Sequence, residues 1–349
     1  MKTIALGRYL VGGNNPCLII AEAGVNHNGS LDEAKALASS AKDIGADCVK
    51  FQTFRAEEVV TTYAPKASYQ IKTTDPHESQ REMLKKLELQ PKDYKELISF
   101  CESEEIMFLS TPYNINDVDF LDELGVPAFK LSSMHAAEPC FAEYVAKKNK
   151  PIILSTGMAS LDEVDHVVRA ILETGNDQLI LLQCTTNYPS TMADANIRAM
   201  ATLQKKFNTL VGYSDHTENE IACITSVALG ACIIEKHFTL DKRKPGPDQM
   251  ASANPDEFER LVKHIRNAEV VLGDGIKRAS AAEQFVALGM RRSIVARRKI
   301  EEGELITEDC LTLKRPSNGI KPSQINSVIG RIARRPILAD SLIVFSDLT

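Results

Sequence analysis

The chain has no long apolar run, and this absence restricts the class of protein. No stretch approaches the roughly 20 consecutive apolar residues that a membrane-spanning helix requires. The opening residues, MKTIALGRYLVGG, are too few and too polar for a secretory signal peptide. We therefore expect a cytoplasmic protein with no membrane partner.

Paired cysteines and a strong excess of one charge are also lacking. The eight cysteines are scattered without a C-x-x-C pair, and several lie inside apolar runs, which is typical of reduced core cysteines. The formal net charge of −6 is mild, so we expect no nucleic-acid partner. The remaining composition, 44% hydrophobic and 25% charged residues, is ordinary for a globular protein.

Eight short apolar runs alternate with longer segments of helical periodicity. Strands buried on both faces of a sheet are almost continuously apolar, as these runs are. Eight strand–helix units in about 270 residues match a (β/α)8 TIM barrel of the α/β class. A doubly wound open sheet is the alternative, although no G-x-G-x-x-G follows the first run. The runs span residues 17–24, 48–53, 106–112, 128–133, 151–157, 179–185, 210–216 and 232–238.

Helix boundaries are marked by particular residues. Ser30, with Glu33 three positions later, has the spacing of an N-cap and capping box. The segment 256–273 supplies the last of the eight helical patterns. Four glycines fit helix C-termini, where a left-handed residue is common: Gly45, Gly125, Gly175 and Gly230.

The C-terminal part of the chain differs from the rest. Residues 280–349 carry 11 Lys and Arg against 8 Asp and Glu, in a chain of negative net charge. From Ser293 onward, short β-prone runs are interrupted by Gly, Pro and Asn. We predict a barrel domain over residues 1–278, a linker over 279–292 and a small β-rich domain over 293–349.

Polar side chains follow every apolar run, at the end where a TIM barrel has its active site. Lys50 and Lys130 can surround an anionic substrate, since lysine is a point charge for phosphate. Strand-end hydroxyl groups can add neutral donors. These hydroxyl groups belong to Thr111, Ser133, Ser155 and Ser214.

Two histidines end consecutive predicted strands, so we expect His216 and His237 to be neighbours. Two imidazoles near carboxylates suit a divalent transition metal, although they also suit acid–base chemistry without metal. Asp248 lies on the loop beyond the last strand and can reach the same mouth. Asp215 is either the N-cap of the next helix or a ligand. The connection 54–90 is long, and long barrel loops often cover the site.

Together these segments resemble the sialic acid synthase family. The resemblance extends from about residue 17 to the C-terminus and is nearest to bacterial N-acetylneuraminate and legionaminic acid synthases. It implies a (β/α)8 barrel followed by a small antifreeze-like SAF domain of the β-clip type. The segments that carry it are AEAGVNHNGSL, VKFQTF, APKASYQIKTT, ESQREMLKKLEL, LSTPY, ILSTGM, GYSDHT, IEKHFTLD, GPDQMAS and KRPSNGI.

The resemblance also implies an activity. Enzymes of this family are transferases that condense phosphoenolpyruvate with an N-acetylmannosamine-type sugar, giving a sialic acid and phosphate. They use a divalent metal, usually Mn²⁺, with Mg²⁺ or Co²⁺ as alternatives. They are expected to be domain-swapped homodimers in which each SAF domain caps the barrel of the other chain.

Individual roles are carried over by the same resemblance. His216 and His237 match the metal ligands, and Arg315 matches an arginine that reaches the site of the other subunit. The catalytic group implied is Glu22, Lys50, Lys130, Asp248 and Arg315. The substrate-binding group implied is Gln52, Thr111, Ser133, His135, Ser155, Tyr188 and Ser214.

One position departs from the family pattern. After the Lys130 strand the family usually has Ser-Gly-Glu, whereas this chain has Ser133, Met134 and His135. An imidazole does not accept hydrogen bonds as a carboxylate does, so we expect this replacement to change either which sugar fits or which group moves protons. Alternatives are pseudaminic acid synthesis, a 3-deoxy-ulosonate synthase that uses a phosphorylated sugar, a barrel hydrolase, and a non-catalytic carbohydrate-binding protein.

Overall fold

The computed structural model describes residues 2–349, apart from the side chains of Ser68, Tyr69 and Lys72. The chain forms two compact units, one ending at Gly273 and the other beginning at Asp274. No helix among the described residues combines the length and apolarity needed to cross a membrane.

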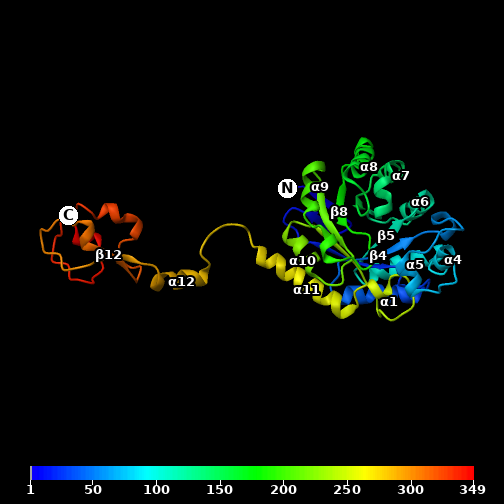
Figure 1. Cartoon of the computed structure of the whole chain (residues 1–349). Helices are drawn as coiled ribbons and strands as arrows, with labels where there is room; N and C mark the ends of the chain where they lie inside the picture. Colours follow the sequence, from blue (N-terminus) through cyan, green and yellow to red (C-terminus); the bar gives the residue numbers. More distant parts are fainter. Residues whose placement is uncertain (1) are drawn as a thin grey trace. The chain divides into compact units, whose positions relative to one another are not determined.

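Eight strands form the centre of the first unit (Figure 1). Hydrogen bonds connect them in parallel pairs in the order β5-β4-β3-β10-β9-β8-β7-β6, and β5 lies beside β6, so the sheet closes on itself. The predicted (β/α)8 barrel is therefore confirmed, and the open doubly wound sheet is excluded. The strands are β3 (Leu18–Gly24), β4 (Cys48–Thr53), β5 (Met107–Pro112), β6 (Phe129–Leu131), β7 (Ile152–Ser155), β8 (Leu179–Cys184), β9 (Leu210–Asp215) and β10 (Ile233–His237).

Helices surround the strands, as the labels in Figure 1 show. Three short helices lie in the long connection between β4 and α5: α2 (Ala56–Val59), α3 (Ser68–Thr73) and α4 (Gln80–Lys85). The main helices are α1 (Leu31–Asp43), α5 (Pro91–Ser103), α6 (Ile115–Glu123), α7 (Pro139–Ala146), α8 (Leu161–Glu173), α9 (Ala199–Phe207), α10 (Ile221–Ala228) and α11 (Pro255–Leu272). Short 3₁₀ turns follow strands at η1 (Ser133–Ala137), η2 (Met192–Ala195) and η3 (Gln249–Ala251).

The predicted helix signals are found where the sequence places them. Ser30 precedes α1, and its hydroxyl accepts a hydrogen bond from the backbone N–H of Glu33. The four predicted C-terminal glycines all have positive φ, from +79° to +96°. Local chemistry therefore sets where these helices begin and end.

An N-terminal hairpin closes one end of the barrel, a feature that the sequence analysis did not predict. It consists of β1 (Thr3–Leu6) and β2 (Tyr9–Gly12), paired antiparallel. Its Ile4, Leu6 and Val11 are buried in one cluster with inward-facing residues from the amino ends of the strands, among them Leu18 and Ile233. The opposite end carries the polar residues.

The second unit contains α12 (Ala281–Met290) and a small module. In the module β11 (Ser293–Ala296) pairs antiparallel with β12 (Leu311–Lys314), and isolated bridges such as Ile300–Ile337 complete the framework. The rest is turns and the 3₁₀ segments η4 (Glu308–Cys310), η5 (Pro322–Ser327) and η6 (Phe345–Asp347). Regular strands are thus fewer than a β-rich domain suggests, although a separate apolar core is present.

Candidate active site

The alternation of side chains along each strand decides what faces the barrel interior. In β3, Leu18 and Ile20 belong to the inner apolar cluster, so Glu22 lies on the same face two residues later. In β10, Ile233 belongs to that cluster and Glu235 follows. The inner lining therefore changes from apolar to polar toward the carboxyl ends of the strands.

Two buried ammonium groups share one carboxylate at this end. The Nζ atoms of Lys50 and Lys130 lie 3.7 and 3.5 Å from the carboxylate oxygens of Glu235. All three side chains are at most 7% exposed. The arrangement is a preorganised cationic cluster whose charge one glutamate partly balances.

Hydroxyl groups complete this cluster. Lys50 donates to Thr111 Oγ1 at 3.0 Å, and Lys130 donates to Ser155 Oγ at 2.7 Å. Ser214 Oγ donates to Glu235 Oε1 at 2.9 Å. The two lysines and three of the four predicted hydroxyl residues are therefore together in the structure.

Glu235 was not among the predicted site residues, although its two-residue spacing from His237 placed both on one strand face. Burial by itself would raise the pKa of its carboxyl group. The ammonium groups of Lys130 and Lys50 outweigh burial and hold the pKa below its ordinary value. Glu235 is therefore ionised, and the two lysines have a fixed counter-charge.

Glu22 lies on the other side of Lys50. Its Oε2 is 2.7 Å from Lys50 Nζ, and its Oε1 accepts a hydrogen bond from Gln52 Nε2 at 3.1 Å. Burial raises the pKa of Glu22 above its ordinary value, despite the opposing effect of Lys50. Glu22 therefore retains a proton to a higher pH than an exposed glutamate does.

The side chains of Glu22, Gln52 and Asp248 converge around Gly24. A Cβ atom at this position would lie 3.3 Å from Gln52 Nε2, 3.4 Å from Glu22 Oε1 and 3.7 Å from Asp248 Oδ2. Its φ of +54° also favours glycine. Asp248, on the loop after β10, thus reaches the mouth of the barrel. Burial, opposed by His216, raises its pKa to about 6.

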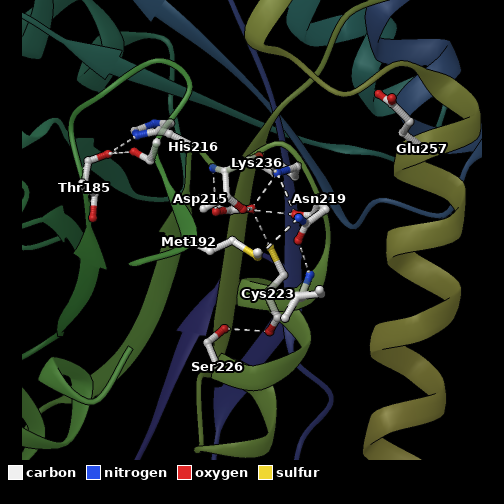
Figure 2. A network of polar contacts seen from close by, with 12 residues as sticks. Thr185, Met192, Asp215, His216, Asn219, Cys223, Ser226, Lys236 and Glu257 are labelled. Atoms are coloured by element: carbon white, nitrogen blue, oxygen red, sulfur yellow. Dashed lines mark hydrogen bonds and ion pairs between the residues drawn. The ribbon is translucent and has the colours of Figure 1, made fainter. Parts of the chain in front are cut away.

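The two histidines face each other, with ring centroids 5.3 Å apart. The ring of Tyr188 packs against both, with its centroid 4.1 Å from that of His216 and, in an edge-to-face contact, 5.5 Å from that of His237. His216 Nδ1 is 2.6 Å from the carbonyl oxygen of Thr185 (Figure 2). When Nδ1–H donates a hydrogen bond to that carbonyl, Nε2 carries the lone pair. This tautomer can bind a metal through Nε2.

The residues present fit a divalent metal with an open coordination sphere. His237 Nδ1 is buried and has no hydrogen-bond partner among the described residues. Burial, and then the nearby His216, lower the pKa of His237 well below its ordinary value, so its imidazole is neutral. In the described part of the chain no three His, Cys, Asp or Glu side chains form a complete metal cage. Oxygen ligands from water or substrate would complete the sphere, as in catalytic metal sites.

Asp215 has neither of the two roles expected from the sequence, the N-cap of the next helix or a ligand. Its carboxylate lies on the outer face of the barrel, where it pairs with Lys236 at 2.6 Å (Figure 2). It also accepts a hydrogen bond from the Thr217 N–H at 3.0 Å. The N-cap residue of α10 is Glu220. Asp215 is thus neither the helix cap nor a ligand facing the histidines. Side chains alternate between the two faces of a strand, and this alternation places the Asp215 carboxylate on the outer face of β9.

Ser133 follows β6 and lies beside the turn that ends β7. Its Oγ accepts a hydrogen bond from the Gly157 N–H at 3.0 Å. A Cβ atom at Gly157 would lie 2.8 Å from that oxygen and 2.3 Å from Thr186 Oγ1. Glycine is therefore required for this close approach.

His135 is enclosed rather than open to the mouth. Its side chain has no exposed surface, stacks on Phe141 at 4.3 Å, and lies 3.2 Å from Ser132 Oγ through Nδ1. Burial lowers its pKa to about 4. The nearby Tyr113 donates its phenol proton to Gln52 Oε1 at 3.0 Å, so His135 borders the residues that hold Gln52.

Arg315 belongs to the second unit. It is exposed, and its Nε donates to the carbonyl oxygen of Met290 at 3.0 Å. Its role at a barrel of another chain stays a prediction.

Comparisons with known proteins agree with this geometry. The NeuB family model matches residues 37–277, and the SAF domain model matches residues 291–349. The chain belongs to the NeuB family. The resemblance deduced from the motifs is therefore confirmed, and the protein is an enzyme of the sialic acid synthase type.

Individual NeuB relatives cover nearly the whole chain. The N,N'-diacetyllegionaminic acid synthase of Campylobacter jejuni is 47% identical over 328 residues, which are 93% of this chain and 98% of the relative. The N-acetylneuraminate-9-phosphate synthase of Homo sapiens is 37% identical over 333 residues, 93% of this chain and 90% of the relative. The sialic acid synthetase structure from Leptospira borgpetersenii, in complex with citrate, is 33% identical, with a TM-score of 0.74 over 82% of this chain and 95% of that chain.

Proposed function

We propose that this NeuB enzyme condenses phosphoenolpyruvate with the open-chain aldehyde of an N-acetylmannosamine-type sugar, giving a nonulosonate and phosphate. One observation carries the proposal. Two buried ammonium groups, Lys50 and Lys130, share Glu235 at the same end of the barrel as the facing imidazoles of His216 and His237. An anion site beside a metal-type site is what this condensation requires.

The cationic cluster suits phosphoenolpyruvate, which carries a carboxylate and a phosphate. Lys50 and Lys130 offset these charges, and Thr111 and Ser155 fix the two ammonium groups by accepting hydrogen bonds from them. Such groups need little reorganisation when charge develops in the transition state. Gln52, Ser133 and Ser214 are the remaining proposed contacts.

The proposed cofactor is a divalent metal, Mn²⁺ before Mg²⁺ or Co²⁺, held by His216 and His237. When bound, such an ion supplies Lewis-acid polarisation of the sugar aldehyde. The Thr185 carbonyl orients the His216 ring, and Tyr188 covers both imidazoles on one side. These contacts restrict the orientation of the His216 ring and pack both imidazoles against Tyr188.

The reaction forms one bond between carbons and breaks one bond between carbon and oxygen. Carbon 3 of phosphoenolpyruvate bonds to the aldehyde carbon, whose oxygen takes up a proton and becomes a hydroxyl group. Water adds to carbon 2 and loses its protons as the ketone forms. The tetrahedral carbon then releases phosphate. Glu22, whose pKa burial raises, is the proposed group that exchanges a proton with this water. Asp248, beside Glu22 and Gln52, is placed to contact the sugar.

We propose a diacetamido sugar as the substrate, leading to a legionaminic-type product. Identity is 47% with the legionaminic acid synthase and 37% with the N-acetylneuraminate-9-phosphate synthase. His135 replaces the family glutamate, and because it is enclosed beside Tyr113, which holds Gln52, we propose that it changes the sugar site indirectly. N-Acetylmannosamine is the second candidate.

We also propose a domain-swapped homodimer in which each Arg315 serves the barrel of the other chain. The helix α12 has no buried residue, and Phe285 and Leu288 are 80% and 64% exposed. At the end of α11, Val270 and Val271 are more than 80% exposed. Exposed apolar side chains grouped in this way on each unit favour surfaces that a second copy covers.

One assay tests the proposed function. The protein is incubated with Mn²⁺, phosphoenolpyruvate and one sugar at a time, and phosphate and the ulosonate product are measured. The sugars are a diacetamido mannose-type sugar, its pseudaminic-type isomer, N-acetylmannosamine and a 6-phosphorylated sugar. We expect the first to give the highest kcat/KM, and EDTA to abolish release. Release without sugar would indicate hydrolysis, and no release with any sugar would contradict the proposal.

A further inference from the structure

Asp215 and Lys236 each lie one residue before a proposed metal ligand, His216 and His237. Both face away from the barrel interior, and they are the last register pair of β9 on β10. His216 follows the end of β9, so no ladder hydrogen bond fixes it against β10. Other contacts must set its position relative to His237.

A buried ion pair supplies those contacts (Figure 2). Lys236 Nζ lies 2.6 Å from Asp215 Oδ2 and donates to the Thr217 carbonyl oxygen at 2.6 Å and to that of Asn219 at 3.4 Å. The side chains of Lys236 and Asp215 are 6% and 0% exposed. The ammonium group of one strand therefore holds the turn that carries His216 on the other.

The carboxylate of Asp215 holds the same turn from its other side. It accepts the Thr217 backbone N–H at 3.0 Å and the Thr217 hydroxyl at 3.2 Å. The Cys223 thiol of α10 donates to it at 3.2 Å. Both charged groups are thus fully hydrogen-bonded, and Thr217 is fixed through backbone and side chain.

The other hydrogen bonds of His216 connect it to a different part of the barrel. Its ring is held by Thr185, and its carbonyl oxygen accepts from the Ser190 N–H at 2.7 Å. These contacts connect His216 to the loop after β8. Lys236, by contrast, connects the turn to β10, which is the strand that carries His237.

Stability alone does not explain such a pair. The cost of removing two charges from water is often as large as their attraction, and apolar residues of similar volume often serve as well. Apolar residues could not form the hydrogen bonds to Thr217 and Asn219. The pair is therefore suited to position a turn rather than to stabilise the barrel.

We propose that Asp215 and Lys236 form a positioning pair that sets the separation of the His216 and His237 imidazoles, and with it the affinity for the divalent metal. The inference rests on the metal site proposed above. Neither residue touches the metal or the substrate. Partners that orient metal ligands typically change metal affinity by about 10- to 100-fold.

The test is Mn²⁺ binding by isothermal titration calorimetry without substrates. The double variant Asp215→Asn/Lys236→Met removes both charges together, so neither is left buried and unpaired. We expect the Kd for Mn²⁺ to rise by about 10-fold or more, with a melting temperature near that of the wild type. At saturating Mn²⁺ we expect kcat to recover toward the wild-type value.

A control removes a less buried ion pair at the other end of the barrel, whose Arg266 and Asp47 side chains are 33% and 20% exposed. Arg266 Nη2 lies 2.8 Å from Asp47 Oδ2, where α11 meets the amino ends of β3 and β4. The variant Asp47→Asn/Arg266→Met should leave the Kd for Mn²⁺ unchanged. An equal loss of affinity there would mean that any barrel destabilisation weakens the metal, and would overturn the inference.

A second variant keeps the proposal testable if the double variant does not fold. Thr217→Val removes only the hydroxyl contacts to Asp215 and to the Asn219 carbonyl. We expect a several-fold weaker affinity for Mn²⁺. Wild-type affinity in the folded variants would overturn the positioning role alone, whereas no Mn²⁺ binding by the wild type would overturn the metal site as well.

Discussion

At the scale of single residues, close contacts restrict what the proposed phosphoenolpyruvate site tolerates. We expect Gly157→Ala to displace Ser133 and Thr186, because the added Cβ would lie within 3 Å of both hydroxyl oxygens. The KM for phosphoenolpyruvate should rise by about 10-fold or more, since a small misplacement of a binding group is costly. Steady-state kinetics with saturating sugar measure this change.

Gly289→Ala is the matched control for that prediction. Gly289 lies in α12, its φ is not in the left-handed region, and an added Cβ atom would meet no other atom within 4 Å. The KM for phosphoenolpyruvate should therefore not change. A Gly157→Ala enzyme with wild-type KM would show that the turn after β7 relaxes without affecting the site.

A second residue-scale prediction concerns acid stability. Burial lowers the pKa of His27 to about 4, from an ordinary value of 6.5. Between these values the unfolded chain binds a proton that the folded chain does not, so stability falls as the pH falls through this window. We expect His27→Asn, which can still accept from the Gly29 N–H as His27 Nδ1 does, to reduce this loss by up to about 3 kcal/mol.

Urea unfolding at about pH 7 and about pH 4.5 measures this difference. His166→Asn is the control, because His166 is exposed on α8 and its replacement should leave the pH dependence unchanged. If the wild type and His27→Asn lost equal stability on acidification, burial of a neutral imidazole would not be the cause.

At the scale of elements, we expect the N-terminal hairpin to contribute to stability and not to catalysis. Leu6 is fully buried in the inner cluster at the closed end of the barrel. We expect Leu6→Ala to lower the free energy of unfolding by about 2–5 kcal/mol, because it leaves a cavity. The ratio kcat/KM should stay near the wild-type value, since the polar residues lie at the other end.

Leu10→Ala is the control, because Leu10 lies in the same hairpin and is 50% exposed. Its stability should change by less than about 0.5 kcal/mol. A large fall in kcat/KM for Leu6→Ala at a temperature where the protein is folded would mean that the hairpin also shapes the active site.

The barrel itself could be predicted because its signal is local. Continuous apolar runs mark the eight strands. Ser30 marks the start of α1 by its capping hydroxyl, and Gly45 marks the end by its positive φ. The hairpin could not be predicted in the same way, because β1 alternates exposed and buried residues and does not form a continuously apolar run. Its burial depends on contacts with distant strands.

Strand alternation determines which residues of each strand face the barrel interior, and this part of the site can be predicted from the sequence. Lys50, Lys130 and His237 lie on inner faces, as their strand positions require. The same alternation turns Asp215 outward and brings Glu235 inward. Pairing between strands far apart in the sequence, such as Lys50 with Glu235, is visible only in the folded barrel.

At the scale of the whole molecule, the proposed shared site predicts complementation between subunits. His216→Ala and Arg315→Ala should each be inactive alone. After subunit exchange, half of the dimers combine one of each, and each mixed dimer has one complete site. We expect about one quarter of the wild-type activity.

Phosphate release after mixing, with exchange confirmed by native mass spectrometry of differently tagged chains, measures this recovery. Mixing two preparations of His216→Ala is the control and should restore nothing. Confirmed exchange without recovery would show that Arg315 acts within its own chain or not at all.

The plugged amino end of the barrel has a kinetic consequence. Because Ile4, Leu6 and Val11 block that end, every reactant must enter through the open end, where the carboxyl ends of the strands lie. Lys50 and Glu235 lie two residues deeper along their strands than Gln52 and His237. Whatever the lysines hold must therefore arrive first and depart last, which predicts a compulsory order of addition in which excess sugar traps the enzyme in a dead-end complex.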